Sequence, residues 1–179
     1  MRTPASPQRD RPQPLRVAEQ IPLSAAGRQP VFFFGTLMDP EILARLLARP
    51  LAPGERARAW LSGFRRVCAR NAPYPVLLPD PLGRVEGILL RRPGREDLRR
   101  INYYESDEYR AELHEVVEEG LGVREAWLFV AREEVLRPGE QPWRLEDWAR
   151  RHKAELLRQI EEWMAELEPA RAGATAARR

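Results

Sequence analysis

The sequence predicts a single α+β domain, and three observations lead to this fold class. The expected elements follow one another as strand, helix, several strands, helix, strands and helix, without the regular alternation that builds a doubly wound parallel sheet. The G-x-G-x-x-G and P-loop signatures of nucleotide-binding folds do not occur in the sequence. The chain of 179 residues has the length of one domain with a core of its own.

Residues 1–29 are expected to form a disordered arm rich in proline and arginine. Six of the 17 prolines fall within the first thirty residues, where apolar side chains show almost no periodicity. Such a segment buries too little surface to offset the entropy lost on ordering. The domain is therefore placed at 30–168, and the Ala- and Arg-rich stretch 169–179 is expected to be a disordered tail.

The domain opens with a buried strand followed by a capped helix. Residues 31–34 are a continuous run of β-favouring apolar side chains that stops at Gly35. Asp39 offers an N-cap, and Pro40 suits the first helical position. Apolar residues then recur with helical spacing until Pro50, which ends the helix.

Several strands occupy the middle of the chain. Residues 55–70 alternate loosely and predict two strands with a kink at 62–63. Segments 74–78 and 84–91 predict two further strands, and the turn-forming residues 80–83 separate them.

The second half of the domain is expected to hold two helices around a pair of strands. A helix is predicted over about 95–105, followed by a strand at 109–118 with one solvent-facing side and another at 125–131. A loop at 137–139 leads into a long amphipathic helix at 145–168. Its polar face mixes Glu with Arg, unlike that of a membrane-binding helix, so we expect a lid or a dimer element.

The positive charge of the chain lies at its two ends, which argues against a nucleic-acid partner. The whole chain carries +3, and residues 1–30 and 169–179 each carry a net +3 of their own. The body, 31–168, has 22 basic and 25 acidic residues and offers no surplus for a basic binding face. Binding through the two ends remains an alternative. No membrane association is expected, because no segment approaches the roughly 20 apolar residues of a span.

The cysteine and histidine content predicts a cytoplasmic domain without metal or cofactor. Cys68 is the only cysteine, which excludes an intramolecular disulfide. His114 and His152 are the only histidines and lie far apart in the sequence. His114 is expected to be a surface or packing residue rather than a catalyst. We expect a monomer or weak homodimer.

Gly35-Thr36-Leu37 is a candidate binding loop. Glycine tolerates positive φ and lets a ligand approach the backbone closely. Amides at a turn and a helix start are unpaired donors that suit an anion. Taken alone, a Gly-Thr pair after a strand is more often only a turn.

Glu105 is a candidate catalytic carboxylate. It lies at the end of the predicted helix, where the helix dipole disfavours negative charge, and it follows two tyrosines. Partial burial there would raise its pKa, as suits a proton shuttle. A glutamate near a helix end is more often a solvated charge, and Asp107 and Glu108 are rival candidates.

Four short segments, in this order and spacing, resemble the gamma-glutamylcyclotransferase-like family, in the branch that includes avirulence-induced plant proteins. They are Val-Phe-Phe-Phe-Gly-Thr-Leu-Met at 31–38, Tyr-Pro-Val-Leu at 74–77, Val-Glu-Gly-Ile-Leu at 85–89 and Arg-Ile-Asn-Tyr-Tyr-Glu-Ser-Asp-Glu-Tyr-Arg at 100–110. The resemblance covers roughly residues 31–135.

The resemblance implies a small mixed or antiparallel β-barrel-like core with flanking helices and a pocket at one end. It implies that Glu105 is a general acid/base and that a small-molecule gamma-glutamyl amine or peptide is the substrate. The α-amine of the substrate would attack its own γ-carbonyl and release 5-oxoproline, a lyase or transferase reaction that needs no cofactor or metal. The expected substrate-binding residues are Phe34, Gly35, Thr36, Leu37 and Tyr109.

Three positions depart from the family pattern. Phe34 stands where Tyr is usual, Asn102 where Asp is common and Ser106 where Gly is common. The lost hydroxyl at Phe34 bears on substrate choice more than on the chemistry, since Glu105 remains. Tyr109 either lines the pocket or only begins a strand. The alternative function is a non-catalytic small-molecule-binding or regulatory domain on the same fold.

Overall fold

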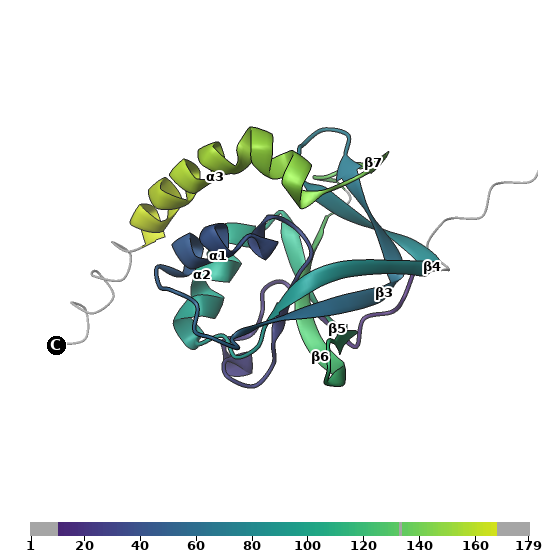
Figure 1. Ribbon diagram of the computed structural model, residues 1–179, viewed down its shortest axis with the longest axis horizontal. Helices are drawn as coiled ribbons and strands as arrows, with labels where there is room; N and C mark the ends of the chain where they lie inside the picture. The colour runs from purple at the N-terminus through teal and green to yellow at the C-terminus, as the bar shows by residue number, and fades with distance from the viewer. Residues whose placement is uncertain (1–10, 133, 168–179) are drawn as a thin grey trace, which may run out of the picture.

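The computed structural model describes residues 11–132 and 134–167 and confirms the α+β class. The labels below follow Figure 1. In chain order the elements are β1 (Arg16–Ala18), η2 (Leu23–Ala25), β2 (Val31–Phe33), η3 (Thr36–Met38), α1 (Pro40–Leu47), β3 (Arg56–Ala69), β4 (Pro75–Leu90), α2 (Arg95–Glu105), β5 (Tyr109–Glu118), β6 (Gly122–Ala131), β7 (Pro138–Pro142) and α3 (Leu145–Leu167), where η denotes a 3₁₀ helix.

Five of the strands close into a barrel. The strands are hydrogen-bonded in the order β1-β5-β6-β2-β4-β3-β7, and β5 also pairs with β3, which joins the two sides. The pair β2–β6 is parallel and the other pairs are antiparallel, so the barrel is mixed, as the resemblance implied. Closure removes the unpaired edges of the five central strands.

The apolar core has two main parts, one inside the barrel and one between the barrel and the helices. Phe32, Phe64 and Leu128 belong to the buried cluster inside the barrel. Neighbouring Phe33 belongs to the other cluster, because successive side chains of a strand point to opposite faces. Figure 1 shows α1 and α2 against one side of the barrel and α3 lying across them.

The strands β3 and β4 are longer than expected. The two strands predicted at 55–70 are one strand, and the kink predicted at 62–63 is a bulge at which Gly63 has a φ of 82°. The segments 74–78 and 84–91 are likewise one strand, from which residues 80–83 bulge out opposite Gly63. The turn-forming residues 80–83 do interrupt the pairing, but β4 pairs with β3 on both sides of them, so the strand continues.

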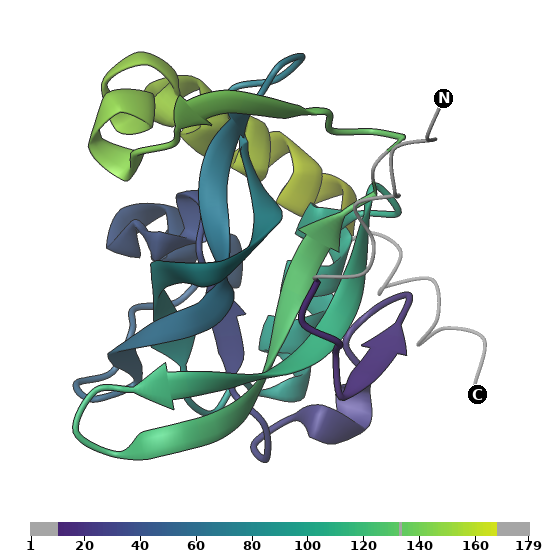
Figure 2. The same cartoon turned by 90° about the vertical axis from the view of Figure 1, so that its right-hand side faces the viewer.

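The expected disorder of residues 1–29 is wrong for residues 11–29. The strand β1 pairs with β5, and Figure 2 shows this segment, in purple, beside that strand. Ile21 is 1% exposed, and its backbone N–H and C=O each bond the side chain of Asn102 at 3.0 Å. The segment is held by a few isolated contacts, such as that of Ile21 with Asn102. A search for regularly spaced apolar residues does not detect contacts of this kind. Residues 1–10 and the predicted tail 169–179 lie outside the described residues.

The polar face of β5, with Glu112 and His114, was expected to face solvent and is instead buried. The exposed residues Glu115 and Val117 lie on the other face. Glu112 is fully buried and accepts hydrogen bonds of 2.8 Å from Arg11 and Arg110. His114 lies 2.8 Å from the same carboxylate and packs edge-on against Phe64, so it is a packing residue. Arg11 belongs to the N-terminal segment, which therefore supplies part of the cover.

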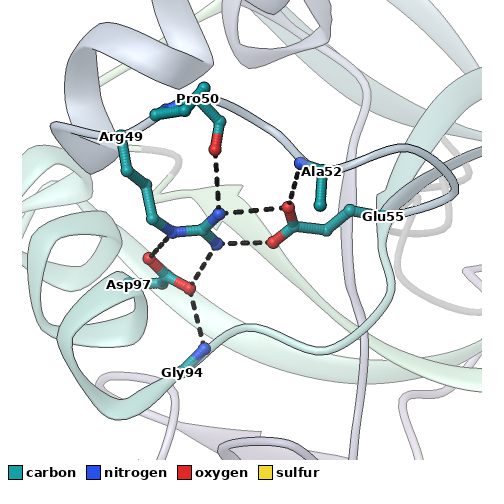
Figure 3. A network of polar contacts seen from close by, with 6 residues as sticks. All are labelled: Arg49, Pro50, Ala52, Glu55, Gly94 and Asp97. Carbon is teal, nitrogen blue, oxygen red and sulfur yellow. Dashed lines mark hydrogen bonds and ion pairs between the residues drawn. The ribbon is translucent and has the colours of Figure 1, made fainter.

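A polar network joins the end of α1 to the start of α2 (Figure 3). The Arg49 guanidinium donates to both carboxylate oxygens of Asp97, at 2.9 and 2.7 Å, and to Glu55. Asp97 in turn accepts from the backbone N–H of Gly94 at 2.8 Å and so caps α2. The pair with Arg49 holds the pKa of Glu55 below its ordinary value. This network fixes α2, and with it the position of Glu105, relative to α1.

The end of the chain differs from expectation at one point. Residues 137–139, predicted as a loop, begin the strand β7, which pairs with β3. The long helix α3 follows as predicted. Within residues 11–132 and 134–167, no helix is both long enough and apolar enough to cross a membrane.

Candidate active site

A cavity of about 150 Å³ lies where one end of the barrel meets α2 and α3. An apolar cavity of that size holds one benzene-sized molecule, so there is room here for a single small organic group. Each predicted site residue lines it, together with residues from β4, β6 and α3. The lining residues are Phe32, Phe33, Phe34, Gly35, Thr36, Leu37, Tyr74, Pro75, Tyr104, Glu105, Glu108, Tyr109, Phe129, Leu156 and Trp163.

The loop after β2 presents its backbone to this cavity. Gly35 has a φ of −123°, so the positive φ expected of it is not found. Glycine is needed there for a different reason, since a Cβ at this position would lie only 3.0 Å from Cγ of Pro75. Close packing of β4 against the loop therefore excludes a side chain at residue 35.

The amides of this loop are available as donors. Gly35, Thr36 and Leu37 stand at the start of the short helix η3, where the first amides have no intrahelical acceptor. Within the described part of the chain, these three N–H groups donate no hydrogen bond outside helices and strands. They are therefore unpaired donors in residues that line the cavity.

Tyr104 joins the loop to the end of α2. Its hydroxyl lies 3.0 Å from Oγ1 of Thr36, and either oxygen can be the donor. Its ring meets Trp163 of α3 edge-on, with 6.1 Å between the centroids. Burial raises the pKa of Tyr104, and the charge of Glu105 adds to the effect. Tyr104 therefore stays a neutral phenol and positions the loop relative to the carboxylate.

Glu105 is the last residue of α2 and combines partial exposure with an apolar environment. Burial raises the pKa of its carboxyl group to about 8. Among residues 11–132 and 134–167, this carboxylate has no hydrogen-bond or ion-pair partner. An unpartnered carboxyl with a pKa near neutrality can both accept and return a proton at physiological pH.

The turn after Glu105 is strained. Ser106 has φ 56° and ψ −159°, a region occupied almost only by glycine. Strain of this kind persists where surrounding structure imposes it, and it gathers at functional sites. The glycine common at this position in the resembling family would meet the same geometry without the cost.

Tyr109 fulfils both of its alternatives, since it begins β5 and lines the cavity. Burial raises its pKa, with further contributions from Glu105 and other neighbours. Of the rival carboxylates, the exposed Glu108 also lines the cavity, whereas Asp107 does not.

Sequence reasoning did not assign Tyr74, Pro75 and Trp163 to the site. The first two lie in one of the four segments that carried the resemblance, which was the available signal. Trp163 lies in the amphipathic pattern of the final helix, and nothing local to α3 distinguishes it. Leu156 joins Trp163 in the cavity wall, so α3 covers the site as a lid would.

The charge of the site is entirely carboxylate. No Lys, Arg or His is among the described residues that line the cavity, whereas Glu105 and Glu108 are. The neutral donors for an anionic group here include the loop amides and the hydroxyls of Thr36, Tyr104 and Tyr109. Within the described residues, no group of three or more His, Cys, Asp or Glu is arranged to hold a metal ion.

Comparison with known proteins places most of this site, all but Leu156 and Trp163 of α3, within one matched region. A family model described as "Gamma-glutamyl cyclotransferase, AIG2-like" matches residues 31–150. AIG2-like protein C of Arabidopsis thaliana is 30% identical over 139 residues, which cover 75% of this chain and 77% of the relative. AIG2-like protein A of the same plant is 27% identical over 130 residues, 71% of this chain and 76% of the relative.

Solved structures agree with the fold. The solution structure of one Arabidopsis thaliana protein aligns with a TM-score of 0.52 at 25% identity and covers 76% of this chain and 91% of that protein. A second Arabidopsis thaliana solution structure aligns with a TM-score of 0.53 at 21% identity, over 81% of this chain and 86% of that protein. The second likeness concerns the fold alone.

Proposed function

The chain belongs to the gamma-glutamyl cyclotransferase, AIG2-like family, and from this premise we propose that it is an enzyme that releases 5-oxoproline from a gamma-glutamyl amine or peptide. One observation carries the proposal. The carboxyl group of Glu105, with its raised pKa, and the free amides of residues 35–37 line a single cavity of small-molecule size.

Binding holds the glutamyl group between the loop and the tyrosines. The amides of residues 35–37 donate to oxygen atoms of the substrate, since no cation lines the described cavity. Tyr104, Tyr109 and Trp163 surround its aliphatic part. This folds the substrate so that its α-amine lies against its own γ-carbonyl, and such orientation supplies a large part of the rate of an intramolecular reaction.

Glu105 moves the proton. The ionised carboxylate takes a proton from the α-ammonium, and the free amine attacks the γ-carbonyl carbon. The developing oxyanion accepts hydrogen bonds from the loop amides. The protonated Glu105 then gives its proton to the departing nitrogen as the C–N bond breaks. The ring nitrogen still carries two hydrogens after the attack, and Glu105 passes one of them to the released amine, which leaves as an ammonium ion. The products are 5-oxoproline and an amine or peptide, and Glu105 is left ionised as it began.

Incubation with a panel of gamma-glutamyl peptides and amines tests the proposal, with 5-oxoproline as the measured product. Replacing Glu105 with Gln is expected to lower kcat by about 10²–10⁴-fold, the usual contribution of a positioned acid/base. Glu115→Gln is the matched control, because Glu115 is an exposed strand residue away from the cavity. Its activity is expected to equal that of the wild type.

Two outcomes would contradict the proposal. One is the absence of 5-oxoproline from every substrate, and the other is full activity of Glu105→Gln. If the same compounds raise the melting temperature of the protein without being converted, the alternative of a non-catalytic binding domain takes its place.

A further inference from the structure

A single arginine outside the cavity binds the backbone of the loop that lines it. Nη1 of Arg66, on β3, donates to the carbonyl oxygen of Phe34 at 2.6 Å, the shortest of its contacts. The same nitrogen lies 3.3 Å from Sδ of Met38, at the other end of the loop, and 3.3 Å from the carbonyl oxygen of Glu86. Arg66 itself does not line the cavity.

Trp143 packs against the guanidinium group of Arg66. The guanidinium carbon of Arg66 lies 5.1 Å from the centre of the Trp143 ring, a cation–π contact. Trp143 is 3% exposed, and its indole N–H donates to the carbonyl oxygen of Pro73 at 3.1 Å. Pro73 directly precedes Tyr74 and Pro75, so one tryptophan steadies the arginine and a second wall of the cavity.

The contacts of Arg66 are not those of a charge placed for stability. Among the described residues it forms no ion pair within 4.0 Å, and its hydrogen bonds go to backbone carbonyls and a thioether. Burial lowers its pKa, although Glu86 and Glu146 lie close enough to oppose this. Arg66 is half-buried, so part of its hydration is replaced by these bonds to the backbone of the loop.

The geometry of the peptide unit supplies that role. The structure contains no cis peptide bond in its described residues, so the unit between Phe34 and Gly35 is trans. In a trans unit the C=O and the following N–H point in opposite directions. Arg66 does not line the cavity and holds the Phe34 oxygen on its own side, so the N–H of Gly35 is directed to the side opposite Arg66.

We propose that Arg66 is a positioning residue that fixes the Phe34–Gly35 peptide, so that the N–H of Gly35 faces the cavity as a donor to the substrate oxygen. A lysine cannot reproduce this arrangement, because it lacks the planar guanidinium that stacks on Trp143. The effect on catalysis rests on the proposed function. The orientation of the peptide does not.

The kinetic test compares Arg66→Met and Arg66→Lys with Arg65→Met. Arg65 is the exposed neighbour on the same strand, so its replacement makes the same change in charge outside the site. Removing one oxyanion donor from an enzyme lowers kcat by about 10²–10³-fold, and a donor that is only misdirected loses about 10–100-fold. Arg66→Met is therefore expected to lose kcat by that factor with KM changed by less than about 3-fold. Arg66→Lys is expected to be intermediate, and Arg65→Met to match the wild type.

A structural readout tests the inference without any substrate. The ¹³C chemical shift of the Phe34 carbonyl reports its hydrogen bond, and the exchange rate of the Gly35 amide reports its environment. Both are expected to change in Arg66→Met and in Arg66→Lys, and to stay at wild-type values in Arg65→Met. Arg66→Lys keeps the charge and serves if Arg66→Met does not fold.

The outcomes separate this inference from the proposed function. If the wild type forms no 5-oxoproline but the Phe34 and Gly35 signals respond to Arg66 alone, the proposed reaction fails and the positioning stands. If the wild type is active and Arg66→Lys changes neither those signals nor kcat, the positioning is overturned. An equal loss of kcat in Arg65→Met would overturn it as well, because the effect would then be one of general charge.

Discussion

At the scale of single residues, the carboxyl group of Glu105 owes its properties to what surrounds it. Burial is the cause of its raised pKa, and among the described residues no partner offsets that cost. With a pKa of about 8, about a tenth of the group is ionised at pH 7. Only a small fraction of Glu105 is therefore in the basic, ionised form at pH 7, but this form is a strong enough base to deprotonate an ammonium group.

The pH dependence of the reaction follows from this value. The attacking amine must lose its proton to ionised Glu105, so kcat/KM is expected to rise with pH and to level off above an apparent pKa of about 8. Initial rates of 5-oxoproline formation between pH 5 and 10 measure it, with substrate well below KM. A rate that is independent of pH over this range would show that Glu105 is not the base.

Strain at Ser106 leads to a prediction about stability. Relief of the φ 56° conformation in Ser106→Gly is expected to raise the free energy of unfolding by about 1 kcal/mol, since the strain costs about 1–3 kcal/mol and glycine returns part of it as unfolded-state entropy. Urea unfolding measures the change. Ser106→Ala keeps the strain and is expected to show no gain. An equal gain in both variants would mean that strain is not the cause.

At the scale of elements, a few polar contacts fix the positions of the helices relative to one another. Nζ of Lys153, on α3, lies 2.8 Å from carboxylate oxygens of both Asp39 and Glu41 at the start of α1. Arg49 joins α1 to α2 as described above. The cavity takes its walls from α2 and α3, so these contacts set its shape.

Removing the Arg49 guanidinium is expected to destabilise the fold. In Arg49→Met, the carboxylates of Glu55 and Asp97 lose their shared cation and repel each other, at a cost of about 2–3 kcal/mol. Denaturant unfolding at pH 7 measures it. Arg45→Met is the control, because Arg45, on α1 four residues before Arg49, pairs with Glu161 at the exposed surface, where such pairs contribute about 0–1 kcal/mol. Equal effects of the two variants would contradict the importance of the network.

The docked N-terminal segment depends on an amide at residue 102. Asn102→Asp keeps the acceptor for the N–H of Ile21 but removes the donor to its C=O and adds a buried charge. We expect a loss of about 2 kcal/mol and faster trypsin cleavage after Arg16 or Arg28, measured by mass spectrometry. Cleavage at an unchanged rate would mean that other contacts hold the segment. This geometry also explains why Asn stands where the family commonly has Asp.

At the scale of the whole molecule, stability is expected to be greatest near pH 5. Glu55 and Glu112 have lowered pKa values in the folded state, so they stabilise it above their ordinary value of 4.5, and this is lost as the pH falls through their folded values. The ionisation of Glu105 affects stability in the opposite direction. Its raised pKa means that the folded protein binds the proton more tightly, so stability falls as the pH rises from 4.5 to about 8.

The variant Glu105→Gln isolates the alkaline part of this profile. At pH 9 it is expected to be more stable than the wild type by about 1–2 kcal/mol, and the gain should disappear near pH 5, where the wild-type carboxyl is protonated. Urea unfolding at pH 5, 7 and 9 measures the profile. Glu115→Gln is expected to follow the wild type. A constant difference at every pH would contradict the linkage.

Much of the site could be predicted from the sequence, but the residues that complete it could not. Glu105 and the loop 34–37 lie in short segments with recognisable local chemistry, and all of them line the cavity. Trp163 reaches the same cavity from a helix whose amphipathic pattern looks ordinary. Arg66 is one of many arginines, and only the hydrogen bond to Phe34 distinguishes it.

The sequence by itself determined the α+β class, the helices, most of the strands and the family, because these depend on patterns within a few residues. Only the tertiary structure decided that residues 11–29 are ordered, that β3 and β4 run on through their bulges, and that the polar face of β5, with Glu112 and His114, is buried. It alone also decided the pKa of Glu105 and the contact of Arg66 with the loop. Each of these depends on contacts between segments far apart in the chain, and burial and hydrogen-bond partners are properties of the packed molecule.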